Sequence, residues 1–171
     1  KKIVSSYDYL ENYFLNNGWE LWAKVFSKKI LENLVYIENI KIGEDAIVFS
    51  QCVKKSRYIM FIPDIIYTYI INSNSISISK SYRLAQHGII AADFISNKLN
   101  VFSNKLNSNA LILLFFSNSS RRALLTSKDP LMKIVKKSFF FRSYEYIGLK
   151  KFLYVIFLLV LCSLNGKRNE N

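Results

Sequence analysis

The sequence predicts an α/β fold over residues 1–80 and helices over the rest of the chain. Helical and extended patterns alternate up to residue 80, which is typical of α/β folds. After residue 80, apolar side chains recur at helical spacing, and an uninterrupted apolar run occupies residues 152–164. We therefore expect three segments, at 1–80, 81–146 and 147–171.

The first segment is expected to alternate between helices and extended runs. Helices are predicted at 7–16, 27–34 and 44–54, and extended runs at 19–26, 35–42, 57–62 and 65–71. Ser27 is placed as the N-cap of the second helix, because its hydroxyl can accept a bond from a free N–H group. Gly43 forms a turn before the third helix, and Pro63 separates the last two extended runs.

The remaining segments are expected to be helical. Helices are predicted at 81–107 and 109–126, with a break near Ser103–Ser108, and Pro130 suits the first turn of another helix. The apolar run at 152–164 spans about 20 Å as a helix, and a membrane-spanning helix needs about 20 residues. This run is predicted to associate with a membrane, either in the interface or dipping partway into the bilayer. A helix packed on the protein and a true span remain as alternatives.

The positive charge is concentrated at the C-terminal end. Residues 121–171 carry eleven basic and three acidic residues, whereas residues 1–80 carry ten and eight. Basic residues beside apolar segments suit an anionic membrane surface. Since residues 1–80 are nearly balanced and carry no recognisable nucleic-acid motif, we expect no nucleic-acid partner.

The cysteines and the histidine carry little chemical signal. Cys52 and Cys162 are too few for a disulfide framework or a zinc site, which favours core positions and a cytoplasmic setting. His87 lies in the middle of a predicted helix, and nothing around it in the sequence supports a functional role. The chain begins at Lys1 without a Met, and we expect it to be a fragment, a processed chain or a trimmed chain.

Four short motifs occur in a fixed order along residues 5–80. They are Trp22-x-Lys24, Gly43-Glu44-Asp45, Tyr67-x-Tyr69 and Asn74-Ser75-Ile76-Ser77. Taken alone, Gly-Glu-Asp is an ordinary acidic start to a helix, which faces the positive end of the helix dipole. The order and spacing together resemble the C-terminal, acceptor-side half of bacterial family 2 glycosyltransferases, which have the GT-A fold.

The resemblance assigns roles to six residues. It implies that Asp45 is the catalytic base that accepts the proton of an acceptor hydroxyl, with Glu44 as its structural or acceptor-contacting neighbour. It implies that Trp22, Lys24, Tyr67 and Tyr69 bind substrate. The competing interpretation makes Trp22 a core aromatic, packs Tyr67 and Tyr69 under the helix at 44–54, and leaves Lys24 solvated.

The donor half of such an enzyme is not in this sequence. Its five aspartates include no pair at D-x-D spacing, so we expect no metal site and no cofactor in this chain. The resemblance implies Mg²⁺ or Mn²⁺ for the complete enzyme, together with a nucleotide-sugar donor and a saccharide or lipid-linked acceptor. We therefore expect residues 1–171 alone not to transfer sugar.

The sequence thus favours a sugar transferase of cell-surface polysaccharide synthesis, held at the inner face of the cell membrane. The main alternative is a non-catalytic, basic membrane-surface protein in which Gly-Glu-Asp is only a helix start. The last alternative, nucleic-acid binding, has the least support.

Overall fold

The computed structural model describes residues 1–16, 18–68, 70, 80–120, 123–125 and 128–168. The strands are β1 (Lys2–Ser5) and β2 (Tyr58–Phe61), and the α-helices are α1 (Ser6–Asn12), α2 (Glu44–Lys55), α3 (Tyr82–Asp93), α4 (Lys105–Ser119), α5 (Leu131–Ser138), α6 (Tyr144–Ile147) and α7 (Leu149–Arg168). Short 3-10 turns lie at η1 (Lys28–Leu31) and η3 (Phe141–Ser143), and a π-helical turn, η2 (Phe94–Lys98), extends α3.

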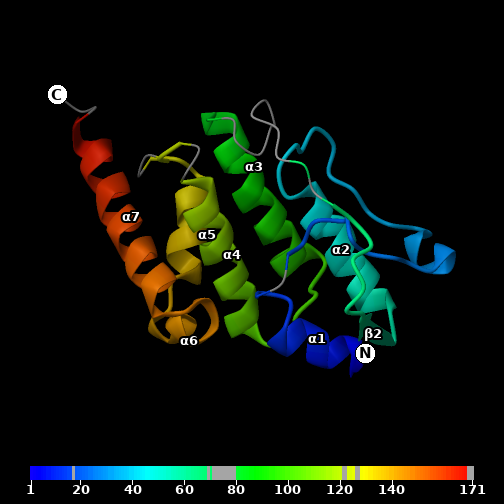
Figure 1. Ribbon diagram of the computed structural model, residues 1–171. Coiled ribbons are helices and arrows are strands. Elements are labelled where there is room, and N and C mark those ends of the chain that lie inside the picture. The colour runs from blue at the N-terminus through cyan, green and yellow to red at the C-terminus, as the bar shows by residue number, and fades with distance from the viewer. Residues whose placement is uncertain (17, 69, 71–79, 121–122, 126–127, 169–171) are drawn as a thin grey trace.

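Helix α4 forms the centre of the helical part. Its residues 110–116 are all buried, and it packs against α3, α5 and α7. Because an α-helix that is apolar on every side has to be enclosed, this arrangement follows from the sequence of α4. Figure 1 shows α7 at one side of the molecule and α2 at the other, with α3, α4 and α5 between them. One continuous hydrophobic core joins Val4 to Cys162.

The sheet ties the two ends of the first 61 residues together. Strand β1 pairs antiparallel with β2, with Lys2 opposite Phe61 and Ser5 opposite Tyr58. Ser5 also caps α1, because its hydroxyl accepts a hydrogen bond from the Asp8 N–H at 3.0 Å. This cap places α1 directly after the strand and against α2.

Gly43 fixes the start of α2 against the helical part. Its φ of 89° lies in the left-handed region, which L side chains rarely adopt. A Cβ at this position would lie 2.5 Å from the Cβ of Ala91 in α3 and 3.2 Å from the ring of Phe115 in α4. Glycine therefore allows both the turn and the close approach of α2 to its neighbours.

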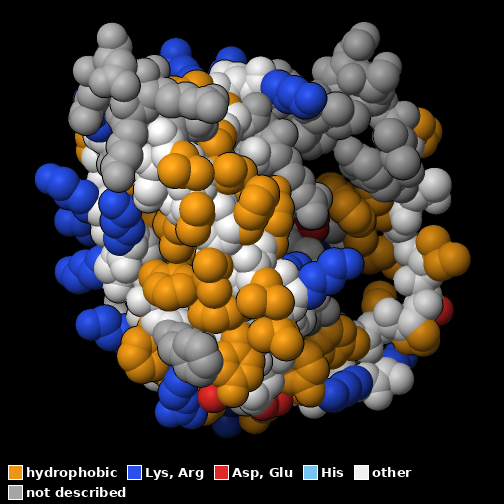
Figure 2. All heavy atoms as spheres, turned by 90° about the vertical axis from the view of Figure 1, so that its left-hand side faces the viewer, with side chains coloured by type: hydrophobic (Ala, Val, Ile, Leu, Met, Phe, Trp, Pro, Cys, Tyr) orange, Lys and Arg blue, Asp and Glu red, His pale blue; other side chains and the backbone are white. Residues whose placement is uncertain are grey.

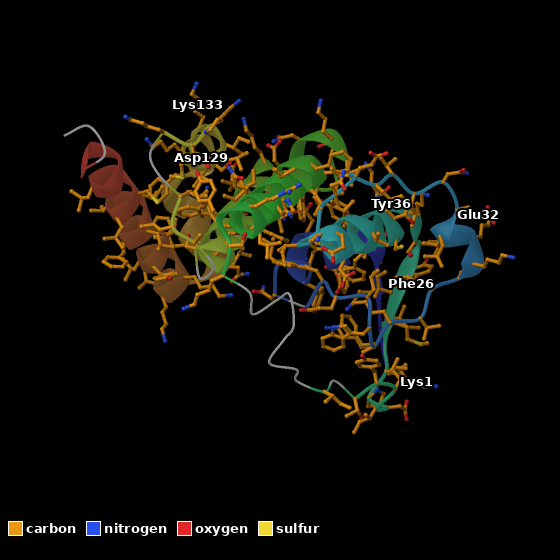
Figure 3. The ribbon with its side chains drawn as sticks, turned by 90° about the horizontal axis from the view of Figure 1, so that it is seen from above. Lys1, Phe26, Glu32, Tyr36, Asp129 and Lys133 are labelled. Atoms are coloured by element: carbon orange, nitrogen blue, oxygen red, sulfur yellow. The ribbon has the colours of Figure 1, made fainter. Side chains whose placement is uncertain are left out.

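Side chains of α2 hold the long loop at 19–42. The Gln51 amide accepts from the Val35 N–H and donates to the Val35 carbonyl, both at 2.8 Å, in the manner of a paired strand. Lys55 donates to the carbonyl of Asn33 at 3.1 Å. Figure 3 shows this loop from above, with Phe26, Glu32 and Tyr36 labelled, on the opposite side of the molecule from Asp129 and Lys133.

Most predicted helices are confirmed, with shifted ends. The helices at 7–16 and 44–54 correspond to α1 and α2, and the apolar run at 152–164 lies within α7. The helix at 81–107 ends earlier, because the chain enters η2 after Asp93 and Asn100 then has a φ of 45°. The helix at 109–126 starts earlier, at Lys105, where the Asn104 side chain caps it by accepting from the Leu106 N–H at 2.8 Å. Pro130 directly precedes α5, as expected.

Two of the predicted extended runs are wrong as strands, and one helix is much shorter. Residues 18–42, all of which the structure describes, contain no strand. Ala23, Asn33 and Asn39 have φ angles of 59°, 52° and 60°, which interrupt the runs at 19–26 and 35–42 and stop the helix predicted at 27–34. Only the turn η1 remains of that helix, and the Ser27 hydroxyl makes no capping bond.

The run at 57–62 is confirmed as β2, whereas residues 65–68 and 70 are not in a strand. Residues 69 and 71 lie outside the described part of the chain. The structure is thus richer in helix than the α/β prediction, with one two-stranded sheet among the described residues. The GT-A assignment stays a prediction.

Candidate functional site

The Gly43-Glu44-Asp45 turn opens α2 at the point where the loop at 19–24 crosses it. Asp45 is partly buried, and its Oδ2 accepts a hydrogen bond from the Leu21 N–H at 3.4 Å. Glu44 is exposed. Of the two carboxylates, Asp45 is the one that the fold fixes in place.

Trp19 anchors the start of this loop. Its indole N–H donates to the Phe14 carbonyl at 2.7 Å, and its ring stacks on Phe115 with centroids 4.6 Å apart. Phe115 is also the residue against which Gly43 packs. The start of α2 and the start of the loop are therefore seated on the same side chain of α4.

Lys24 lies over the ring of Phe49 and interacts electrostatically with Asp45. Its Nζ is 4.8 Å from the Phe49 ring centroid and donates to the carbonyl of Glu20. Burial lowers the pKa of Lys24, while attraction to Glu20 and Asp45 opposes that fall. Because it interacts with both acidic residues, Lys24 links the loop electrostatically to the start of α2.

Trp22 and Tyr67 meet although 45 residues separate them in the sequence. Their rings stack with centroids 5.5 Å apart and an angle of 24°. Trp22 keeps 40% of its surface exposed and Tyr67 keeps 49%. Neither ring is therefore buried in the core, which contradicts the competing interpretation for these two residues. Tyr69, the other predicted binding residue, lies outside the described residues.

A cleft of about 680 Å³ opens beside these residues. Its walls are residues 18–30, the Phe49–Val53 face of α2, and residues 56–66. Trp22, Lys24 and Glu20 line it, and most of the other lining side chains are apolar. Asp45 and Tyr67 contact the same loop, next to the cleft.

One charged group of the cleft was not predicted from the sequence. Glu20 is the acidic side chain in its lining, and its position two residues before Trp22 was the available signal. Cys52 also lines the cleft, and burial raises the pKa of its thiol, which keeps it protonated at neutral pH.

Two buried polar residues outside the cleft form hydrogen bonds with the main chain or with neighbouring side chains. His87 accepts a hydrogen bond at Nδ1 from the Lys41 N–H at 3.2 Å. The pKa of its ring is lowered, and burial is the main cause. Asp129 accepts from the Tyr82 hydroxyl, from Gln86 at 2.9 Å and from the N–H of Leu131, the first residue of α5, at 2.9 Å. Both therefore have structural partners.

Within the described part of the chain, no three His, Cys, Asp or Glu side chains come close enough to hold a metal ion. Comparison of the sequence and the structure with protein-family models, curated proteins and solved structures finds no match in any of the three.

Proposed function

We propose that this chain is the acceptor-side half of a family 2 glycosyltransferase and that Asp45 is its general base. The observation that supports this most is the meeting of three separate motifs beside one cleft. Trp22-x-Lys24, Gly43-Glu44-Asp45 and Tyr67 are joined by the Asp45–Leu21 hydrogen bond and by the Trp22–Tyr67 stack. These motifs carried the resemblance to the family.

The proposed step is an inverting transfer. The oxygen of an acceptor hydroxyl attacks the anomeric carbon of a nucleotide-sugar, and the bond from that carbon to the diphosphate oxygen breaks. The hydroxyl proton passes to the Asp45 carboxylate, and a nucleoside diphosphate leaves. A carboxylate at the start of a rigid helix, held by Leu21, suits this role because its position is fixed before the acceptor binds.

The aromatic pair and the lysine supply the binding groups. The half-exposed rings of Trp22 and Tyr67 offer flat apolar surfaces on which a sugar ring can pack. Lys24 lines the cleft and offers N–H donors to sugar hydroxyls or to a phosphate. The acceptor would then lie along the loop at 19–26 with its reacting hydroxyl toward Asp45.

The residues present do not fit the Mg²⁺ or Mn²⁺ of the complete enzyme. No aspartates lie at D-x-D spacing, and the described residues hold no metal-binding cluster. We therefore assign no step to a metal in this chain, and a separate donor-binding half has to supply the nucleotide-sugar. In this proposal the enzyme works at the inner face of the cell membrane, where lipid-linked acceptors are found.

Saccharide binding to residues 1–171 tests the acceptor site directly. The chain has two tryptophans, so a ¹H–¹⁵N spectrum has two indole N–H signals, which Trp22→Phe assigns. Titration with a panel of mono- and oligosaccharides should shift the Trp22 signal and leave that of Trp19, which is stacked on Phe115, in place. A panel that shifts neither signal, or both equally, would contradict the proposed acceptor site.

A further inference from the structure

Helix α7 has two apolar faces, and the protein covers only one of them. The inner face contributes Phe152, Val155, Leu158 and Cys162 to the core. It packs against α4 and α6, and Phe152 stacks on Phe139 with centroids 5.3 Å apart. This face fixes the helix to the protein along most of its length.

The outer face of α7 is also apolar, although it is exposed. An exposed stripe runs along it at helical spacing, with 37–61% of each side chain open to solvent, and comprises Leu149, Leu153, Ile156, Phe157, Val160 and Leu164. The stripe is about 22 Å long at 1.5 Å per residue. Figure 2 shows apolar side chains gathered on the side of the molecule where α7 lies. Large continuous apolar surfaces mark binding sites.

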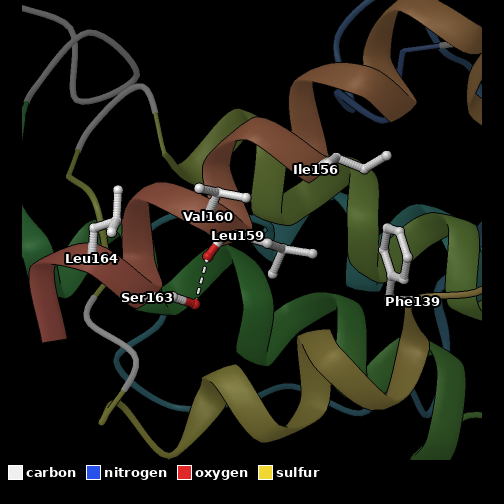
Figure 4. A pocket seen from close by; sticks show the side chains of 6 residues that line it. All are labelled: Phe139, Ile156, Leu159, Val160, Ser163 and Leu164. Carbon is white, nitrogen blue, oxygen red and sulfur yellow. Dashed lines mark hydrogen bonds between the residues drawn. The ribbon is translucent and has the colours of Figure 1, made fainter. Parts of the chain in front are cut away.

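A shallow groove lies in this surface, next to the end of α5. It has a volume of about 360 Å³ and is lined by Phe139, Ile156, Leu159, Val160, Ser163 and Leu164. Its polar side chain, Ser163, donates its hydroxyl proton back to the Leu159 carbonyl at 2.9 Å, as Figure 4 shows. The groove thus offers hydrocarbon surface to whatever binds there.

Positive charge borders the apolar surface. Lys133, Lys136 and Lys137 of α5 are exposed, as are Lys150 and Lys151 in the first turn of α7. Lys136 is close enough to α7 that its charge opposes the rise that burial causes in the pKa of Cys162. Basic side chains gather along one edge of the apolar face in Figure 2.

Acidic groups do not offset this charge. Residues 128–164 carry seven basic and two acidic residues. Of the two acidic residues, Glu145 pairs with Arg142 at 3.1 Å, and Asp129 is buried against Tyr82 and Gln86. The edge of the surface therefore presents ammonium groups to a partner.

We propose that the outer face of α7 binds in the plane of an anionic phospholipid bilayer. The apolar stripe enters the acyl region, and the lysines of α5 and of the first turn of α7 lie at the lipid phosphates. Apolar burial combined with headgroup attraction is the general mode of binding for interfacial helices. This inference does not depend on the proposed sugar transfer, and either can fail alone.

Three alternatives fit the surface less well. A span would require α7 to leave the core, and none of the described helices is long and apolar enough to cross a membrane. A two-fold dimer would place the stripes of two copies against each other. Both copies would then bring their bordering lysines to the same interface, where the like charges repel. A nucleic acid would leave the apolar centre of the surface without a partner.

The test is binding of the full chain to vesicles, measured by co-sedimentation. We expect tight partitioning onto phosphatidylcholine vesicles that contain phosphatidylglycerol and at least tenfold weaker partitioning onto phosphatidylcholine alone, since each lysine at the surface contributes about fivefold. Phe157→Asp and Val160→Asp should each weaken binding by about tenfold or more, because a carboxylate would enter the acyl region. Both side chains are exposed, so circular dichroism should show an unchanged fold.

Ile65→Asp is the matched control, because Ile65 is 90% exposed and lies outside α7. It should bind as the unmodified chain does, whereas Lys133→Ser combined with Lys137→Ser should weaken binding only where phosphatidylglycerol is present. A Phe157→Trp variant should show quenching by brominated acyl chains. Equal binding by the Asp variants and the control would overturn the proposal. The proposal would also be overturned if the chain did not bind vesicles and instead formed a dimer that Phe157→Asp dissociates.

Discussion

The loop around the candidate site and the helices behind it are held by different forces. The loop at 19–42 has no strand, and it is fixed by side chains that bond to its main chain, such as Gln51 to Val35 and Asp45 to Leu21. The helices from α3 to α7 share a core of fully buried apolar side chains centred on α4. A site built on polar contacts can open locally, whereas a packed core opens only with the whole protein.

The largest effect is expected where the two regions meet. Gly43→Ala should destabilise the protein by about 3 kcal/mol, because a left-handed backbone costs an L residue about 1–2 kcal/mol and the new Cβ would overlap Ala91. Urea unfolding measures this loss. A loss of no more than about 1–2 kcal/mol, which the left-handed backbone alone explains, would show that α2 is not packed tightly on α3 and α4.

A smaller and local effect is expected from the loop clamp. Gln51→Ala removes both bonds to Val35 and should cost about 1–3 kcal/mol, since it leaves main-chain groups of the loop without these partners. Hydrogen exchange should speed up at the Val35 amide while amides in α4 keep their protection. Leu111→Ala, in the centre of α4, should instead lower the protection of both regions together. A uniform response to Gln51→Ala would contradict the distinction between the two regions.

The smallest effect concerns alkaline pH. Burial raises the pKa of Cys162 to about 11 from an ordinary 9.0. A raised folded pKa favours the protonated, folded state, so this contribution is complete below pH 9 and is lost as the pH rises toward 11. Unfolding free energies of Cys162→Ala should therefore change less between these two pH values than those of the unmodified chain. An identical pH dependence would show that the thiol is solvated and not in the core.

The helices were predictable because their signals are local. Apolar periodicity located α2 to within one residue, whereas α4 begins four residues before and ends seven residues before the helix predicted at 109–126. Helix α7 extends the apolar run by three residues before it and four after it. The loop at 19–42 was not predictable, because its alternating aromatic pattern imitates a strand. Its conformation depends on Gln51 and on positive φ angles at Ala23 and Asn33, neither of which a local pattern reveals.

The candidate site was predictable in part. The order of motifs named Trp22, Lys24, Asp45 and Tyr67, and the structure brings them together. It leaves Glu44 exposed at the edge. The role of Glu20 could not be predicted, because the lining of a cleft depends on distant parts of the chain. Membrane contact of the run at 152–164 was expected from the sequence, but which face of α7 stays exposed was not, because that depends on the helices packed against it. Such features require the three-dimensional structure.

The central proposal is that Asp45 acts as the base, and sugar transfer by this chain combined with the proposed donor-binding half tests it most directly. Asp45→Asn keeps the shape of the side chain and an acceptor for the Leu21 N–H, but removes the basic carboxylate. Turnover should fall by about 10²–10⁴-fold while the fold and saccharide binding at Trp22 persist. Glu44→Gln, the exposed neighbour, should lose less than about tenfold. Turnover of Asp45→Asn within about twofold of the unmodified enzyme, or an equal loss in Glu44→Gln, would contradict the account.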